Sequence, residues 1–360
     1  MSPQGIIVVN KDFGISSFQV VARLRKMFKM KRIGHCGTLD PFATGVLPLA
    51  LDRGTAAIQF MEKYAKSYVV LAVLGTATDT YDIEGEISAS IPTEELEELY
   101  TSGKLAERLK EVLPHFSGSI EQVPPMYSAI KHQGKALYKY AREGQEIERE
   151  AREIEVEIKD LALFDKTLLE EILAKKNFTL PQALKEDSTV FLYAELAVSK
   201  GTYIRSWVHD LGKALTVNAY AAALKRTVCG PYTLDDKSLS TEELFALQDK
   251  TELKGQDYFA YLDEIGVIRK LITAFSDFPK LELSLAEAKD LSNGKRVKVA
   301  MSRLHNVLSN EDEINFQNYS FAPLLCYYKE QAVAVVEPRQ EGKSYLLKIR
   351  RVFAQDGDFS

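Results

Sequence analysis

Residues 34–48 read GHCGTLDPFATGVLP, and this stretch places one carboxylate, Asp40, in a loop of glycines, small residues and prolines. An Asp before a Pro is common in ordinary turns, because its side chain hydrogen-bonds nearby backbone amides and the residue before proline avoids the helical region. The glycines here also permit close approach of another backbone, and Leu39 and Phe42 supply apolar walls around the single acid. The stretch therefore predicts a rigid loop that holds Asp40 for chemistry.

The segment that leads to this loop is basic. Ser16 or Ser17 can cap a helix that continues to about residue 30 and turns its Lys and Arg side chains outward. The whole chain has a net charge of −5, but residues 1–60 contain eight Lys and Arg residues against three acids. A local excess of this kind can attract a polyanion, although charge alone fits a solvated helix face equally well.

Length and composition indicate a globular protein of two or more domains. The chain has 360 residues, of which 46% are hydrophobic and 27% charged. No apolar run approaches the length of roughly 18 residues that a membrane span needs, and no signal peptide precedes the strand-like residues 5–9. We therefore expect a cytoplasmic protein without membrane contact. Three cysteines lie far apart and outside any CxxC pair, which predicts reduced thiols and no zinc site: Cys36, Cys229 and Cys326.

Strand and helix patterns alternate over the first three quarters of the chain, which predicts a mixed α+β body and not a doubly wound parallel sheet. Apolar or alternating runs predict strands at 67–74, 154–158 and 190–198. Helical patterns predict helices at 92–112, 207–211 and 218–225.

Three further segments stand apart from this pattern. Residues 125–153 carry mixed charges and tyrosines after two prolines, which indicates an exposed excursion, and residues 162–188 are polar, which indicates an irregular surface insertion. From about residue 276 the chain changes to short apolar runs after a capping box at 284–287, which predicts a small, separate β-rich domain at 276–360 beside a body at 1–275.

Several chemistries are excluded by the motifs that the sequence lacks. It contains no Walker P-loop, no GxGxxG after a strand, no GxSxG, no HExxH and no paired Cys/His ligands. His35 and Cys36 are sequence neighbours, with no sign of an activated nucleophile. We therefore expect a carboxylate enzyme that uses neither a cofactor nor a metal.

Five motifs occur together in a recognisable order: GHCGTLDP at 34–41, KSYV at 66–69, QVPPMYSAIK at 122–131, SKGTYIR at 199–205 and LKR at 224–226. In this combination the chain resembles the TruB family of tRNA pseudouridine-55 synthases, in their bacterial stand-alone form, over about residues 5–232. The resemblance implies a mixed, mainly antiparallel sheet flanked by helices and loops. It also implies, more weakly, a small C-terminal β-barrel-like PUA domain that binds RNA.

The resemblance implies catalytic roles for three residues. Asp40 matches the carboxylate that starts cleavage of uridine's C1′–N1 bond, after which the base turns and rejoins through C5. Whether Asp40 attacks C1′ or removes the C2′ proton stays open. Arg205 matches the arginine that pairs with this carboxylate, and Tyr68 matches the aromatic that stacks on the target base.

Other residues match substrate contacts of the family. Tyr203 corresponds to a second active-site tyrosine, Leu224 to an apolar wall, and His35 to the histidine that helps fill the stack vacated by a flipped uridine. Three exposed basic residues are expected to grip phosphates, namely Lys131, Arg23 and Lys26. The implied partner is the T-arm of tRNA, and the stand-alone form implies a monomer.

Two departures and two alternatives remain. Cys36 stands where the family commonly has Thr, and Asp12 where it commonly has Pro. An RNA-folding chaperone would use the same RNA-binding surface without depending on isomerisation. A glycosidase that uses a single carboxylate is a weaker alternative, because no second acid occupies a comparable motif position.

Overall fold

The body of the protein is built on one large sheet. The computed structural model describes residues 4–176, 178, 180, 184, 189–307, 314–315, 320–321, 323–342 and 344–359. Within these residues the sheet has ten strands: Gly5–Lys11 (β1), Ile33–His35 (β2), Ala43–Leu51 (β3), Lys66–Leu74 (β4), Gly118–Gln122 (β7), Arg152–Asp165 (β10), Val190–Val198 (β11), Ala219–Cys229 (β12), Tyr232–Thr233 (β13) and Ile268–Arg269 (β14).

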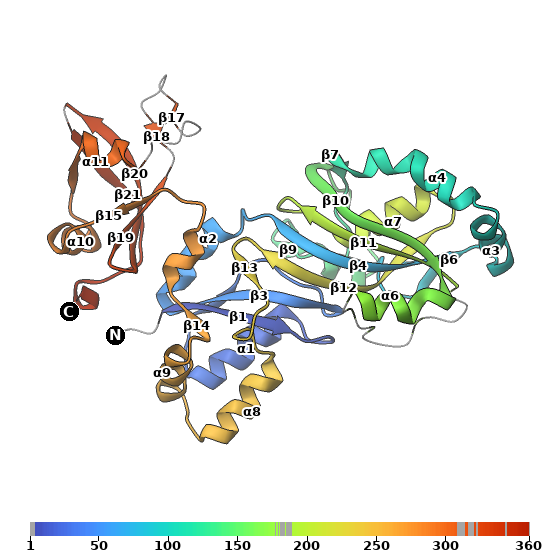
Figure 1. Cartoon of the computed structure of the whole chain (residues 1–360), viewed down its shortest axis with the longest axis horizontal. Helices are drawn as coiled ribbons and strands as arrows, with labels where there is room; N and C mark the ends of the chain where they lie inside the picture. Colours follow the sequence, from blue (N-terminus) through green and yellow to red (C-terminus); the bar gives the residue numbers. More distant parts are fainter. Residues whose placement is uncertain are drawn as a thin grey trace.

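The strand order is β14-β1-β3-β12-β4-β11-β10-β7, with β2 beside β3 and β13 beside β12. The pairing of β12 with β3 is parallel, and the other pairings in this sheet are antiparallel. The strands predicted at 67–74, 154–158 and 190–198 are confirmed as β4, part of β10 and β11. The mainly antiparallel α+β body is thus present (Figure 1).

The helix predicted at 218–225 is wrong, because these residues belong to the central strand β12. Asn218 has a φ of 64° and turns the chain directly into the sheet. The alanine-rich run that follows has high helix propensity, but this preference is weak beside tertiary packing. Small side chains suit this strand, where residues 219–223 are almost fully buried and pair with β4.

Helices cover the sheet at both ends. The predicted N-terminal helix is confirmed as α1 (Ser17–Phe28), whose capping box uses Ser16. It lies with α8 (Thr241–Thr251) and α9 (Gln256–Glu264) beside β1, and α7 (Ile204–Ala214) lies toward β11 and β12 (Figure 1). The helix expected at 92–112 is two helices, α3 (Thr93–Thr101) and α4 (Lys104–Val112), because Gly103 separates them with a φ of 80°.

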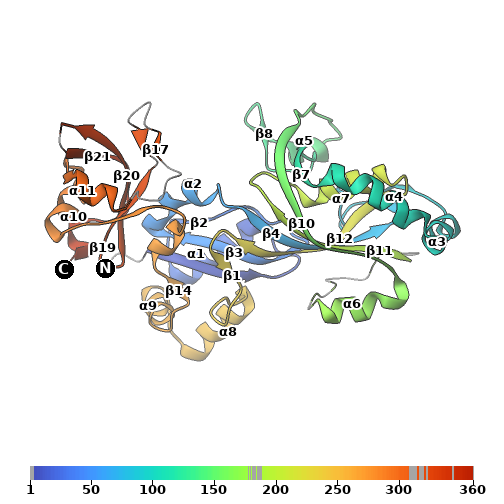
Figure 2. The ribbon, with the colours of Figure 1, turned by 45° about the horizontal axis from the view of Figure 1, so that its top comes forward.

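The excursion at 125–153 is largely exposed, as the sequence predicts. It contains β8 (Lys131–His132), β9 (Lys135–Ala136) and α5 (Leu137–Arg142), which project from the sheet (Figure 2). A second small pair lies near α3, formed by β5 (Thr76–Thr78) and β6 (Ile87–Ser90).

The expectation of an irregular insertion at 162–188 is wrong for its first half. Residues 162–165 continue β10 and pair with β11, and η3 (Lys166–Leu168) leads into α6 (Leu169–Lys175). Leu169 and Leu173 are buried in the main core, so their apolar side chains draw this helix onto the sheet. Residues 177, 179, 181–183 and 185–188 lie outside the described residues.

A second, curled sheet forms the C-terminal part. Its described strands are Lys280–Glu282 (β15), Lys298–Ala300 (β16), Ile314–Asn315 (β17), Ser320–Phe321 (β18), Leu324–Tyr328 (β19), Gln331–Glu341 (β20) and Ser344–Val352 (β21). The predicted capping box at 284–287 starts α10 (Leu285–Ser292), and α11 (Met301–His305) follows β16. Residues 308–313, 316–319, 322 and 343 of the expected domain lie outside the described part.

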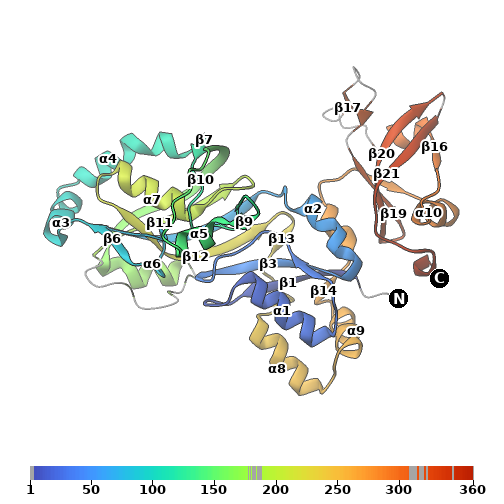
Figure 3. The same cartoon turned by 180° about the vertical axis from the view of Figure 1, so that it is seen from behind.

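One apolar cluster joins the two sheets. Phe275 from the connecting turn η4 (Leu271–Phe275) and Phe353, which follows β21, pack with Met61 of α2 (Ile58–Met61). Figure 3 shows α2 between the large sheet and the C-terminal sheet. Short turns complete the chain: η1 (Asp52–Ala57), η2 (Leu113–Phe116) and η5 (Asp356–Phe359). Among the described helices, none combines the length and the apolar character that crossing a membrane requires.

Candidate active site

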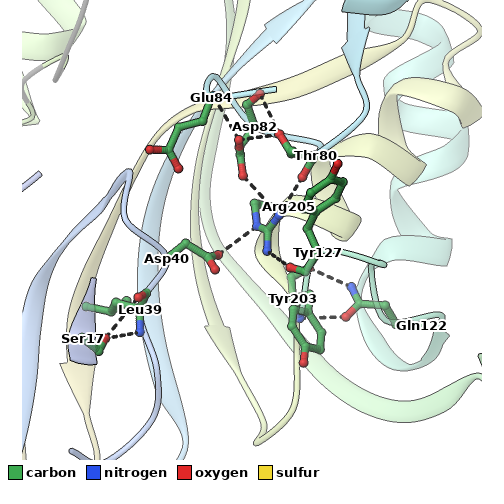
Figure 4. A network of polar contacts seen from close by, with 10 residues as sticks. All are labelled: Ser17, Leu39, Asp40, Thr80, Asp82, Glu84, Gln122, Tyr127, Tyr203 and Arg205. Carbon is green, nitrogen blue, oxygen red and sulfur yellow. Dashed lines mark hydrogen bonds and ion pairs between the residues drawn. The ribbon is translucent and has the colours of Figure 1, made fainter. Parts of the chain in front are cut away.

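Asp40 lies in the loop between β2 and β3, and contacts on both sides fix the backbone of this loop. Ser17, at the start of α1, accepts a hydrogen bond from the Leu39 amide (2.9 Å) and donates one to the Leu39 carbonyl (3.1 Å). On the other side, the buried Lys11 ammonium donates to the Pro41 carbonyl (3.1 Å). The loop therefore presents the Asp40 carboxylate in a defined position, as the sequence predicts (Figure 4).

Arg205, in the first turn of α7, is hydrogen-bonded by all three of its guanidinium nitrogens. Its Nε donates to Asp40 Oδ2 at 2.8 Å, and its Nη1 and Nη2 donate to the carbonyls of Thr80 (2.7 Å) and Tyr127 (2.8 Å). The Arg205 side chain is only 4% exposed, whereas that of Asp40 is 35% exposed. Each nitrogen of the guanidinium is thus bound by a protein group, while the carboxylate still faces open space.

Asp82 is a second carboxylate at Arg205, with its Oδ2 3.1 Å from Nη1. It is itself held by the Thr80 hydroxyl (2.6 Å) and the Glu84 amide (3.0 Å). Burial raises the pKa of Asp82, and the Arg205 charge opposes that shift. Burial also lowers the pKa of Arg205, but Asp40 and Asp82 outweigh it, so the net shift is upward and the guanidinium stays charged.

The sequence motifs do not predict this second half of the network. Thr80, Asp82 and Tyr127 reach Arg205 from two loops, and two of these three contacts use backbone carbonyls, whose identity no side chain reveals. The signal that was present is the TDTYD run at 78–82, with two acids directly after a buried strand.

A pocket of about 310 Å³ opens beside Asp40 and Arg205. Four other predicted site residues also line it: Tyr68, Tyr203, Leu224 and His35. The backbone of Tyr203 is fixed by Gln122, whose side chain accepts from its amide (2.8 Å) and donates to its carbonyl (3.0 Å). Burial raises the pKa of both tyrosines, and burial next to Arg226 lowers the pKa of His35.

The three predicted phosphate-binding residues lie elsewhere. Arg23 and Lys26 are exposed on α1, and Lys131 is exposed on β8 in the excursion, so none of them lines the pocket. The pocket instead contains three basic residues without a predicted role: Lys66, Lys200 and Arg226. Within the described residues, no group of three or more His, Cys, Asp or Glu side chains could hold a metal ion.

Comparison with known proteins places this geometry in a family. The model for the TruB family pseudouridylate synthase (N terminal domain) matches residues 25–204. The chain belongs to the TruB family. The tRNA pseudouridine synthase B of Lactobacillus delbrueckii subsp. bulgaricus is 37% identical over 297 residues, which cover 82% of this chain and 87% of that protein. The Streptococcus sanguinis protein of the same name is 33% identical over 352 residues, covering 97% of this chain and 99% of that one.

Solved structures extend the likeness to the C-terminal sheet. The chain in a Cbf5-Nop10-Gar1 complex superposes with a TM-score of 0.61 at 21% identity, covering 99% of this chain and 86% of that one. The chain in the archaeal box H/ACA sRNP Nop10-Cbf5 complex gives 0.59 at 20%, covering 99% and 88%. The fold expected from the TruB resemblance is confirmed, and the C-terminal sheet is a half-barrel consistent with a PUA-like domain.

Proposed function

We propose that this TruB-family protein is a tRNA pseudouridine synthase that isomerises the T-loop uridine at position 55. The observation that carries the proposal is the contact between the Asp40 carboxylate and the buried Arg205 guanidinium, at the edge of a pocket sized for a single nucleoside. Both homologues named above are called tRNA pseudouridine synthase B, which supports tRNA as the substrate.

The target uridine must leave its stack to reach Asp40. A base inside a folded RNA loop is stacked, and enzymes that act on such bases extrude them at a cost of about a few kcal/mol. Tyr68 offers a ring for the extruded base to stack on, Leu224 an apolar wall and Tyr203 a second aromatic side. We assign His35, at the pocket edge, to the space that the base vacates.

Asp40 then acts on the sugar as an ionised carboxylate. Arg205 holds it with a charge-assisted hydrogen bond, which aims it into the pocket. From there it either attacks C1′ or removes the C2′ proton, and each route breaks the C1′–N1 bond. The base turns and C5 bonds to C1′, either as the bond between Asp40 and C1′ breaks or as Asp40 returns the proton to C2′. The hydrogen on C5 then leaves as a proton, and N1 takes one up.

RNA outside the pocket is held by the exposed basic residues, in this proposal. Lys131 lies on the projecting excursion and Arg23 and Lys26 on α1, where each is exposed and available to phosphates. The C-terminal half-barrel, at the end of the molecule, extends the contact with the T-arm (Figure 1). We further propose that the protein acts as a monomer, without cofactor or metal, in the cytoplasm, where tRNA is the partner.

Tritium release from tRNA labelled at uridine C5 tests the proposal, because isomerisation must exchange that hydrogen. We expect release by the wild type and none above background by Asp40→Asn, which still binds tRNA. Asp249→Asn, on the exposed face of α8, is the control and should match the wild type. Absence of release by the wild type, with tRNA bound, would contradict the proposal and favour an RNA chaperone. Undiminished release by Asp40→Asn would remove Asp40 from the mechanism.

A further inference from the structure

Two basic residues share the pocket floor with Tyr68. Lys66 and Tyr68 are alternate residues of β4, so their side chains point to the same face of the sheet. Arg226 of β12 is the register partner of Tyr68, which places it on that face as well. All three line the pocket, so the two cations lie directly beside the ring that we assign to the target base.

Both cations are buried and incompletely satisfied. Arg226 is 0% exposed; its Nε donates to the Val46 carbonyl (2.7 Å) and its Nη2 to the Gly37 carbonyl (3.1 Å). Its Nη1 has no hydrogen-bond partner in the described part of the chain. The Lys66 ammonium, in a residue 9% exposed, donates only to the Tyr64 carbonyl (2.6 Å), among contacts with described residues.

No carboxylate of the described residues balances these charges. Arg205 contacts two aspartates, whereas Lys66 and Arg226 form no ion pair with any described residue. Glu62 at the pocket rim is half exposed and lies 3.9 Å from Lys200 instead. The buried Cys229 thiol is nearby, and a hydrogen bond from Cys36 together with both cations lowers its pKa. Even as a thiolate it would neutralise only one of the two positive charges.

Buried charges in proteins are normally paired, because an isolated charge loses its hydration without compensation. The Asp40, Arg205 and Asp82 group meets this rule, and the Lys66 and Arg226 pair does not. Gly37 adds a further constraint, since a Cβ at this residue would lie 3.2 Å from both Arg226 Nη1 and the Lys66 side chain. The catalytic loop thus packs closely on two cations whose missing partner is an anion.

We propose that Lys66 and Arg226 form a site for an oxygen anion of the bound substrate, an inference that rests on the proposed function. Two oxygens have this chemistry. One belongs to the phosphate next to the flipped uridine. The other is a uracil carbonyl oxygen, which gains negative charge when the C1′–N1 electron pair leaves with the base and loses it when C5 bonds to C1′. The proton that C5 then releases is balanced by one that N1 takes up. Either anion supplies the charge that the protein lacks.

The test combines a protein change with changes in the RNA. Lys66→Met removes the ammonium and keeps the length of the side chain, Lys66→Arg restores the charge, and Lys110→Met on the exposed face of α4 is the matched control. A synthetic T-arm stem-loop carries either a methylphosphonate at one linkage of the target uridine, or sulfur in place of uracil O2 or O4. Affinity, single-turnover pseudouridine formation and melting temperature are measured for every pair.

On unmodified RNA we expect Lys66→Met to lower affinity or rate by about tenfold or more, the usual size of a lost charge-assisted contact. Lys66→Arg should recover most of this loss, and Lys110→Met should lose nothing. The RNA change that removes the contacted oxygen should lower the affinity or rate of the wild type by a similar factor. The same RNA change should cause no additional loss in Lys66→Met, which already lacks the contact. A methylphosphonate with this pattern assigns the site to phosphate, and a thiouridine assigns it to the base.

Two results would overturn the inference. One is that Lys66→Met has the same affinity and rate as Lys110→Met. The other is that, for every altered RNA, the loss caused by Lys66→Met and the loss caused by the RNA change simply multiply, which would show that the two groups do not interact. If Lys66→Met does not fold, the wild-type protein still tests the site. A wild type whose affinity and rate are unchanged by every altered oxygen also rejects the site. A wild type that binds the stem-loop but forms no pseudouridine refutes the proposed function instead, and the affinity data still report on the anion site.

Discussion

Arg205 is the residue on which the geometry of the candidate site depends most. It lies between two carboxylates, of which Asp40 is 35% exposed and Asp82 only 4% exposed. The Asp82 carboxylate is buried, and it accepts hydrogen bonds from Thr80 and Glu84 and pairs with Arg205. In the proposed mechanism Asp82 therefore acts through Arg205, by fixing the guanidinium that orients Asp40.

This role predicts the effect of Asp82→Asn. The amide keeps the size of the side chain but removes the charge that faces Arg205, so the guanidinium is held less firmly. We expect single-turnover pseudouridine formation to fall by about tenfold or more while tRNA affinity stays near the wild-type value. A drop in affinity with an unchanged rate constant would show that Asp82 serves RNA binding instead. The melting temperature separates either effect from unfolding.

At the scale of single elements, α7 holds the 78–82 turn with two side chains on one helix face. Arg205 binds the Thr80 carbonyl, and His209, one turn later, stacks on Tyr81 with ring centroids 3.7 Å apart. Tyr81 has a φ of 65°, an unfavourable conformation for a residue with a side chain. The stack with His209 therefore stabilises Tyr81, a strained residue that lies between Thr80 and Asp82, which both contact Arg205.

Substitutions of His209 test this arrangement. Burial lowers its pKa to about 4, so the ring is neutral at pH 7 and a neutral aromatic can replace it. We expect His209→Phe to keep activity and stability within about twofold and 0.5 kcal/mol of the wild type. His209→Ala should lower the free energy of unfolding by about 1 kcal/mol or more and slow pseudouridine formation. Equal rates for the two variants would show that the stack does not support the site.

The sequence predicts elements well where periodicity is strong and contacts are local. Val190–Val198 is a strand whose apolar run is interrupted only by Glu195, and α1 begins where Ser16 caps it. β12 cannot be predicted in this way, because its alanines have helix propensity and are extended only through pairing with neighbouring strands. At the site, motifs identify Asp40 and Arg205. The contacts of Arg205 with Thr80 and Tyr127 involve loops that are distant in sequence and come together only in the folded protein.

Across the whole molecule, the two sheets are joined by aromatic packing and not by a loose linker. Phe353 of the C-terminal part lies 5.2 Å from Phe275 and 6.5 Å from Phe60, between ring centroids. Arg53 and Asp358 add an ion pair across the same junction at 2.8 Å, with both side chains about nine-tenths buried. The half-barrel is thereby held in one orientation relative to the pocket.

Removing one ring should loosen this junction. Phe353 is 1% exposed, and truncation of a buried Phe to Ala costs about 3–5 kcal/mol. We expect Phe353→Ala to lower the melting temperature and to weaken binding of full-length tRNA more than binding of a T-arm stem-loop. Phe18→Ala is the control, since that ring is 70% exposed and its loss should change the unfolding free energy by less than about 0.5 kcal/mol. A melting temperature unchanged by Phe353→Ala would contradict the shared core.

The position of β12 has a consequence for biosynthesis. β3 and β4 follow each other along the chain, yet they flank β12, a strand that begins only at Ala219. A ribosome has therefore made more than half of the polypeptide before the centre of the sheet can close. Until then Asp40 and the side chains of β4 lack their neighbours Leu224 and Arg226. Pairing between distant segments is also slow. The nascent chain thus completes the pocket late, and a product truncated before β12 lacks the finished pocket that we propose for the uridine.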